Sequence, residues 1–161
     1  MYQNEIKIVL DKIIALLTFL IVSPVFVLIS LVLFLLQKRV FFIQTRVGKN
    51  QKRFSIYKFQ TMSEERDVDG KLLSDEARIT AFGKFLRATS LDEFPQFFNI
   101  LRNDMNLIGP RPYMIGEKSK IAKENEDIIL EVKPGITGLW QVSGRNNLSF
   151  EKRVELDKWY I

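Results

Sequence analysis

The uncharged stretch IIALLTFLIVSPVFVLISLVLFLL, residues 13–36, sets the organisation of this 161-residue chain. Twenty of its 24 residues are apolar, and the four others are Thr18, Ser23, Pro24 and Ser30. As a helix the stretch would be about 36 Å long, enough to cross a bilayer core of roughly 30 Å. A secretory signal peptide is the rival interpretation. It fits less well, because the run is long for a signal core and Lys38 and Arg39 follow without a small-residue cleavage site.

Pro24 lies near the middle of this stretch, where it removes a backbone hydrogen bond at a cost of about 3 kcal/mol in an ordinary helix. Ser23 can satisfy a freed backbone group. One interpretation is a kinked spanning helix, and the other is a helix that turns back and leaves on the side it entered. Basic residues on both flanks favour the second. They are Lys7 and Lys12 before the stretch and Lys38, Arg39, Arg46, Lys49, Lys52 and Arg53 after it.

The remaining residues predict a mixture of helices and short strands. Runs rich in Phe, Ile, Val and Tyr predict strands at 40–45 and 54–59, joined by a turn at 48–51. Further elements are expected as helices at 79–86, 91–101, 116–131 and 149–161, a loop at 64–78 and a short strand at 139–142. The expected fold class is α+β and mostly helical, with a membrane segment at 1–37 and a globular domain at 38–161.

The composition excludes several kinds of chemistry. The chain has no cysteine and no histidine, which excludes disulfides, thiolate nucleophiles, His-based triads and zinc sites that need these ligands. Acid–base or covalent chemistry must then use carboxylates, Lys, Tyr, Ser or Thr. The net charge is +5, and residues 38–63 hold seven basic and no acidic side chains. Such a block fits a nucleic acid, a nucleotide or an anionic membrane surface, or a solvated basic face.

The carboxylate pair Asp92-Glu93 is the main candidate for chemistry. Ser90 with Glu93 three residues later matches a capping box, which is a purely structural role. The same geometry would place Asp92 at a helix start, where unpaired N–H groups favour an anion. A carboxylate there can attack a phosphoryl group and form an acyl-phosphate type intermediate.

Helical spacing separates the two carboxylates by environment. Glu93 shares a helical row with Phe97 and Ile100, which predicts a raised pKa. Asp92 shares a row with the polar Gln96 and Asn99, which predicts a low pKa, so the pattern assigns Glu93 to acid–base work and Asp92 to nucleophilic attack.

A carboxylate that faces a pyrophosphate needs cations nearby. The candidates are Lys58, Arg87, Arg111 and Arg145. Arg111 lies between two prolines, which preorganises it to bind phosphate with both arms of its guanidinium group. Arg145 lies in the Gly144–Asn147 loop, which suits close approach by a ligand. An ordinary surface role is the alternative for each of them.

With these residues in place, the chain resembles the monotopic bacterial phosphoglycosyl transferases, the polyprenyl-phosphate sugar-phosphate transferase family. The similarity extends over nearly the whole chain. The blocks that carry it are Ser23-Pro24, FFIQTRVG (41–48), YKFQTM (57–62), SLDEFPQ (90–96), NILRNDM (99–105), GPRP (109–112), KPGITGLWQV (133–142) and GRN (144–146). The match is specific because so many blocks occur in order.

The resemblance implies a re-entrant membrane helix at residues 1–37 and a catalytic domain at 38–161, on the cytoplasmic face of the bacterial inner membrane, with Mg²⁺ as cofactor. In such enzymes the Asp of the pair attacks the β-phosphate of a UDP-sugar, UMP leaves, and polyprenyl (undecaprenyl) phosphate takes the phosphosugar. The implied partners are therefore a UDP-sugar, a polyprenyl phosphate and the lipid bilayer, and no nucleic acid.

The same resemblance assigns roles by position. It implies that Asp92 is the nucleophile and a metal ligand, and that Glu93 is its catalytic partner. The residues implied to line the phosphate and nucleotide site are Lys58, Arg87, Arg111 and Arg145, with Asp157 as a further substrate-binding residue.

Two features depart from the family pattern. Lys38-Arg39 stands where relatives usually have Gly-Pro or Gly-Ser before the first strand, and relatives usually continue past the position of Ile161. The chain resembles the small, single-domain type. Two other functions stay open: a membrane-anchored basic protein that binds anionic lipid without catalysis, and an anchored nucleic-acid-binding module, against which the core-like spacing of the aromatic residues argues.

Overall fold

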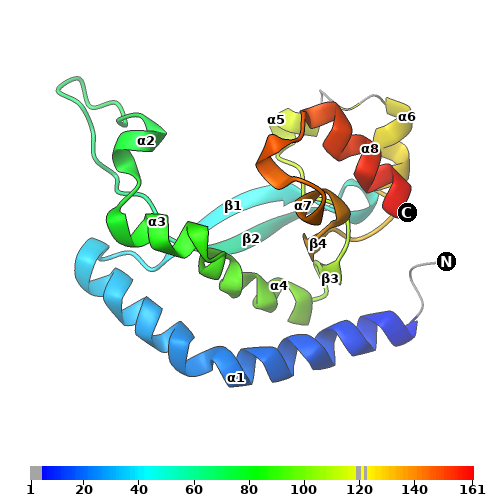
Figure 1. Cartoon of the computed structure of the whole chain (residues 1–161), viewed down its shortest axis with the longest axis horizontal. Coiled ribbons are helices and arrows are strands. Elements are labelled where there is room, and N and C mark those ends of the chain that lie inside the picture. The colour runs from blue at the N-terminus through cyan, green and yellow to red at the C-terminus, as the bar shows by residue number, and fades with distance from the viewer. Residues whose placement is uncertain (1–4, 119–120, 122) are drawn as a thin grey trace. The chain divides into compact units, whose positions relative to one another are not determined.

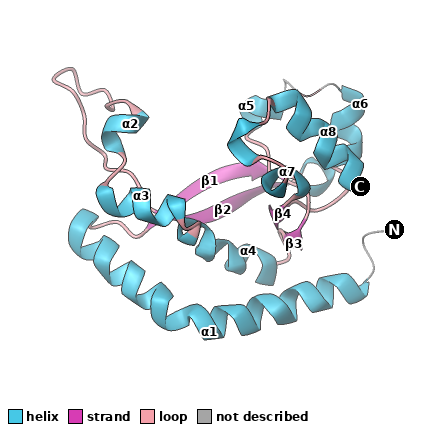
Figure 2. Ribbon diagram, viewed as in Figure 1, coloured by secondary structure: helices cyan, strands magenta, loops and turns pink. Residues whose placement is uncertain are grey.

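The computed structural model describes residues 5–118, 121 and 123–161, and it is an α+β fold dominated by helices, as the sequence predicts (Figures 1 and 2). The helices are α1 (Glu5–Gln37), α2 (Asp75–Arg78), α3 (Ala81–Ala88), α4 (Phe97–Leu101), α5 (Ile115–Lys118), α6 (Lys123–Ile129), α7 (Leu139–Val142) and α8 (Phe150–Tyr160). The 3₁₀ helices are η1 (Lys49–Gln51), η2 (Leu91–Gln96) and η3 (Arg145–Asn147). The strands are β1 (Phe41–Val47), β2 (Arg53–Phe59), β3 (Asn106–Ile108) and β4 (Gly135–Thr137).

Helix α1 contains the whole apolar stretch and continues as a helix through Pro24. Within the described residues it is the helix that is long and apolar enough to cross a membrane. Most of its large apolar side chains are exposed, among them Leu17, Ile21, Leu28 and Leu36. Exposure on this scale distinguishes α1 from the buried core helix of a soluble protein and indicates association with a membrane.

The contacts within the chain define two compact units. The first unit is made of Met1–Leu20, Gln44–Ile56 and Gln96–Ile161, and the second of Ile21–Ile43 and Tyr57–Pro95. Helix α1 and both strands of the β1–β2 sheet therefore contribute residues to each unit. The predicted division at residue 37 concerns membrane and catalytic roles, which this packing does not test.

In the first unit, a short parallel sheet and an apolar core fix the C-terminal half of the chain. Strand β3 pairs with β4 in parallel, with Asn106 opposite Gly135. Ala15 of α1 is fully buried in a core with Ile56, Ile100 and Met105. Helix α8 packs against α6 and α7. Three separate segments of sequence thus meet in one core.

In the second unit, the second half of α1 packs against β2 and α3. Ile29 and Leu33 of α1 are buried with Phe59 and Leu86. Helix α3 begins after Thr80, whose side-chain oxygen accepts a hydrogen bond from the Gly83 N–H at 2.9 Å. This cap holds the start of α3 beside Thr61.

Most of the predicted elements are present, with informative exceptions. The strands at 40–45 and 54–59 and the turn between them are confirmed within one or two residues, as is the helix at 149–161, which Ser149 caps. The helix at 116–131 is divided into α5 and α6; residues 119, 120 and 122 lie outside the described residues. The prediction of a strand at 139–142 is wrong, because this segment forms helix α7, in which Trp140 is buried. The β3–β4 pair was not predicted, since its strands are short and pair far apart in sequence.

Replacing Gly83 with Ala should destabilise the second unit. Ala would ordinarily stabilise a helix by about 1 kcal/mol over Gly. A Cβ atom at Gly83 would, however, overlap the backbone carbonyl oxygen of Thr61 and lie 2.8 Å from its carbonyl carbon. We expect Gly83→Ala to lower the free energy of unfolding by about 1–3 kcal/mol, measured by denaturation in detergent micelles.

Gly116→Ala is the matched control, because a Cβ atom there meets nothing within 4 Å. It should be neutral or stabilising by up to about 1 kcal/mol. Equal effects of the two substitutions would contradict the close approach of α3 to Thr61.

Candidate active site

The Asp92-Glu93 pair lies on the 3₁₀ helix η2 rather than at the start of an α-helix. Ser90, which precedes η2, has a left-handed backbone with φ of 58°, whereas a capping residue is normally extended. The Glu93 N–H donates to the Ser90 carbonyl oxygen at 3.2 Å, which closes a tight turn. The backbone at Ser90 thus differs from that of an ordinary capping residue, and the carboxylates are positioned by a tight turn and a short 3₁₀ helix.

In the second unit, Lys58 joins the carboxylate pair. Lys58 Nζ lies 2.7 Å from Glu93 Oε1, and the two side chains are 25% and 23% exposed. Strand β2 supplies Lys58, so the ion pair connects η2 to the sheet. Arg87 of α3 donates from Nε to Thr61 Oγ1 at 2.9 Å. The structure thus brings together four of the predicted residues, namely Lys58, Arg87, Asp92 and Glu93.

Burial raises the pKa of Asp92 above its ordinary value of 3.8. The charge of Lys58 opposes this shift, Glu93 adds to it, and Arg87 opposes it. The low pKa expected from the helical row is wrong. Gln96 and Asn99, on which that expectation rested, are themselves buried, at 2% and 0% exposed, so the row faces the protein rather than water. Asp92 is a partly desolvated carboxylate beside two cations.

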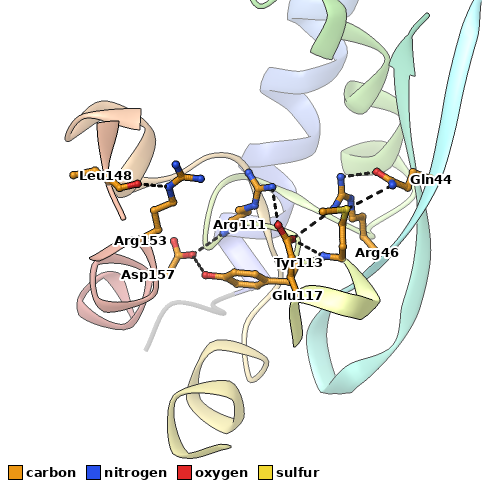
Figure 3. Close-up of polar contacts among 9 residues, drawn as sticks. Gln44, Arg46, Arg111, Tyr113, Glu117, Leu148, Arg153 and Asp157 are labelled. Atoms are coloured by element: carbon orange, nitrogen blue, oxygen red, sulfur yellow. Dashed lines mark hydrogen bonds and ion pairs between the residues drawn. The ribbon is translucent and has the colours of Figure 1, made fainter. Parts of the chain in front are cut away.

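In the first unit, a second polar cluster surrounds Arg111 (Figure 3). Arg111 Nη2 lies 3.6 Å from Glu117 Oε1, and its guanidinium carbon lies 5.4 Å from the centre of the Trp140 ring. Arg153 of α8 approaches the same ring at 5.1 Å. Arg46 extends the cluster, with Nη1 3.9 Å from Glu117 Oε2. The cluster carries more positive than negative charge, which suits an anionic ligand.

Asp157 lies in this cluster, below the surface. It is fully buried in α8, and its Oδ2 accepts hydrogen bonds from the Tyr113 hydroxyl at 2.7 Å and from the Arg111 backbone N–H at 3.2 Å. Burial raises the pKa of Asp157 to about 6, against the lowering effect of these hydrogen bonds. Burial together with the neighbouring Asp157 also raises the pKa of Tyr113.

Sequence reasoning missed five members of this cluster as site residues: Arg46, Tyr113, Glu117, Trp140 and Arg153. A signal was available for Tyr113, because an aromatic residue directly after the Pro-Arg-Pro segment has a hydroxyl that needs a partner when buried. Glu117 and Trp140 gave no comparable local signal. Arg145 lies on η3 and is exposed, with a left-handed φ of 49°.

Comparison with known proteins identifies the family. Residues 2–161 match the family described as bacterial sugar transferase. The chain belongs to the bacterial sugar transferase family.

Relatives with descriptive names cover this chain to different extents. An uncharacterized sugar transferase, EpsL of Bacillus subtilis, is 47% identical over 71% of this chain and 56% of its own length. The undecaprenyl-phosphate galactose phosphotransferase of Salmonella typhimurium is 37% identical over 97% of this chain and 36% of its own. The UDP-glucose:undecaprenyl-phosphate glucose-1-phosphate transferase of Klebsiella pneumoniae is 39% identical over 71% of this chain and 26% of its own. The chain thus spans between about a quarter and somewhat over half of these relatives.

Of the two carboxylates, Asp92 has the chemistry to serve as a ligand of Mg²⁺. No cluster of three or more Asp or Glu side chains occurs in the part of the chain that the structure describes. Mg²⁺ does not need one, because it usually takes one or two carboxylates and completes its shell with water and substrate phosphates. Asp92 is partly exposed and not bound up in the Lys58–Glu93 ion pair, so it is the carboxylate suited to this role.

Replacing Asp92 and replacing Glu93 by their uncharged amides should have opposite effects on the stability of the folded protein. Because the folded pKa of Asp92 is raised, the folded state binds this proton more tightly than the unfolded chain does. The free energy of unfolding therefore falls as pH rises through the window between 3.8 and the raised pKa, and the penalty is largest above that window. We expect Asp92→Asn to raise the midpoint of thermal unfolding at pH 7.5 and to lose this advantage below the window.

Glu93→Gln should instead lower the free energy of unfolding by up to about 1 kcal/mol, because it leaves Lys58 without its ion-pair partner. Both variants are compared in one detergent across pH 4 to 8. Destabilisation by Asp92→Asn at neutral pH would show that Asp92 is not the desolvated carboxylate.

Proposed function

We propose that the chain transfers a phosphosugar from a UDP-sugar to polyprenyl phosphate, at the cytoplasmic face of the bacterial inner membrane. The observation that carries the proposal is the partly buried Asp92-Glu93 pair beside Lys58 and Arg87, on a chain with an apolar helix α1. The names of the relatives from Salmonella and Klebsiella support undecaprenyl phosphate as acceptor.

In the proposed first step, a carboxylate oxygen of Asp92 attacks the β-phosphorus of the donor. The new bond joins Asp92 to phosphorus, and the bond from phosphorus to the bridging oxygen breaks, so that UMP leaves with the electron pair. Desolvation of Asp92 removes water from the attacking oxygen and raises its basicity, while Lys58 and Arg87 favour its ionised form. These opposing effects suit a nucleophile that must be both charged and reactive.

In the proposed second step, a phosphate oxygen of the polyprenyl phosphate attacks the same phosphorus. The bond to Asp92 breaks and returns its carboxylate, which completes the cycle without a change in redox state. Glu93 holds Lys58 at 2.7 Å, so it keeps the cation beside the reacting carboxylate. Arg111 and Arg145 are proposed to contact anionic groups of the donor, and Arg111 is suited to this by its fixed setting between two prolines.

Asp92 would also bind Mg²⁺, which when present supplies positive charge that neutralises the phosphates of the donor. The sugar itself is not defined by these residues. A membrane-anchored basic protein without catalysis is the second candidate, supported by the run of basic side chains at 38–63.

The first test of the proposal is a covalent adduct. Incubation with a UDP-sugar and Mg²⁺, without acceptor, should add one phosphosugar mass that peptide mass spectrometry assigns to Asp92. Asp92→Asn should give no adduct and should lower UMP release by at least about 10³-fold, because no nucleophile remains. Assays of UMP release over a panel of UDP-sugars identify the donor.

Three controls sharpen this test. Asp75→Asn removes an exposed carboxylate elsewhere in the second unit and should retain wild-type turnover. Excess chelator should stop UMP release, and added Mg²⁺ should restore it. Full turnover by Asp92→Asn would overturn the mechanism, and the absence of UMP release with every UDP-sugar would favour the non-catalytic candidate.

We further propose that α1 enters and leaves the membrane on the cytoplasmic side, supported by Pro24 inside the helix and basic residues at both ends. The chain has no native cysteine, so single cysteines at Glu5 and Lys52 report the two flanks. In intact cells, both should be protected from a membrane-impermeant thiol reagent until the inner membrane is opened. Labelling of the Glu5 position from the periplasm would show a spanning helix instead.

A further inference from the structure

Arg111 has an unusual backbone environment that depends on Asp157. Pro110 and Pro112 carry no N–H, so Arg111 provides the only backbone donor of the Pro110–Pro112 segment. That donor bonds to Asp157 Oδ2 at 3.2 Å, from a side chain of α8 that is fully buried. A buried N–H without a partner costs about 1–3 kcal/mol, so this bond constrains the segment.

Asp157 is itself held in place by a hydrogen bond, and one of its two carboxylate oxygens is unused as an acceptor. The hydroxyl of Tyr113 donates to the same Oδ2 at 2.7 Å (Figure 3). The backbone N–H of Val47 donates to the Tyr113 carbonyl oxygen at 3.0 Å. Oδ1 of Asp157 is buried and has no hydrogen-bond partner among the described residues. A carboxylate with half of its acceptors unused is costly to bury, which is hard to explain by stability alone.

The side chain of Arg111 is held by residues of α7 and α5. The Arg111 guanidinium carbon lies 5.4 Å from the centre of the Trp140 ring, and the guanidinium carbon of Arg153, one turn before Asp157 on α8, lies 5.1 Å from the same centre. The guanidinium also meets Glu117 at 3.6 Å. The backbone of Arg111 is thus fixed from α8, and its side chain is fixed by Trp140 and Glu117.

We propose that Asp157 is a positioning residue, which sets the place of the Arg111 guanidinium and does not itself touch the donor. The sequence resemblance implied direct substrate binding by Asp157, but complete burial separates its carboxylate from a ligand at the surface. The inference rests on the proposed function, since Arg111 acts on the reaction only if it binds the phosphates of a nucleotide donor.

The first measurement is amide hydrogen exchange at Arg111, by NMR in detergent micelles. Asp157→Ala should reduce the protection of this amide by about tenfold or more, because the acceptor is gone. Asp157→Asn keeps an oxygen acceptor in place and should retain most of the protection. Unchanged protection in Asp157→Ala would overturn the proposal, because the bonds of Gly109 and Pro110 to β4 would then suffice to hold the segment.

The second measurement is a double-mutant cycle on the affinity for UDP, by calorimetry with Mg²⁺. Asp157→Ala should weaken UDP binding by about tenfold in the wild-type background and by less than about twofold in the Arg111→Ala background, because the two changes remove one interaction. Equal losses in both backgrounds would mean that Asp157 contacts the ligand or acts independently of Arg111, and would overturn the proposal.

Val154→Ala is the matched control, since Val154 is buried in α8 in the same core as Tyr113. It should lower the thermal midpoint without changing UDP affinity or Arg111 exchange. A loss of UDP affinity equal to that of Asp157→Ala would reduce Asp157 to a stabilising role. If UDP fails to bind the wild type while Arg111 exchange still depends on Asp157, the proposed function fails and the structural coupling stands.

Discussion

The burial of α1 side chains in two separate cores is the constraint on which the rest of the structure depends. Ala15 packs with Ile56 and Ile100 in one unit, while Leu33 packs with Phe59 in the other. A purely lipid-anchored helix would need neither set of contacts. Because the remaining apolar surface of α1 is exposed, one helix both organises the protein and carries the surface that suits a bilayer.

The position of the carboxylate pair follows from this packing. Strand β2 is fixed in the second unit through Phe59, so it presents Lys58 toward η2, and Leu86 fixes the helix that carries Arg87. Burial then raises the pKa of Asp92. The protein thus holds a carboxylate in surroundings that disfavour its charge, a cost typical of functional sites and unexplained by stability.

The Arg111 cluster shows a second use of burial. A guanidinium gains little from one long ion pair at 3.6 Å, but an aromatic ring and a fixed backbone reduce its freedom. Asp157 fixes the backbone of Arg111 from inside the protein, and its own Oδ1 is left buried without a hydrogen-bond partner among the described residues. The partly buried Asp92 and the fully buried Asp157 therefore have different proposed roles: Asp92 as the nucleophile and Asp157 as the support for a cation.

The sequence by itself determined the long apolar helix, the β1–β2 sheet, the C-terminal helix, and the restriction of chemistry to a His- and Cys-free set that includes Asp92 and Glu93. These features depend on composition and on spacing within a few residues. The tertiary structure decided the parallel β3–β4 pair, the helix at 139–142, the raised pKa of Asp92 and the burial of Asp157 beneath Arg111. Each of these depends on which distant segment covers a residue and excludes water from it, and this cannot be read from a local sequence pattern.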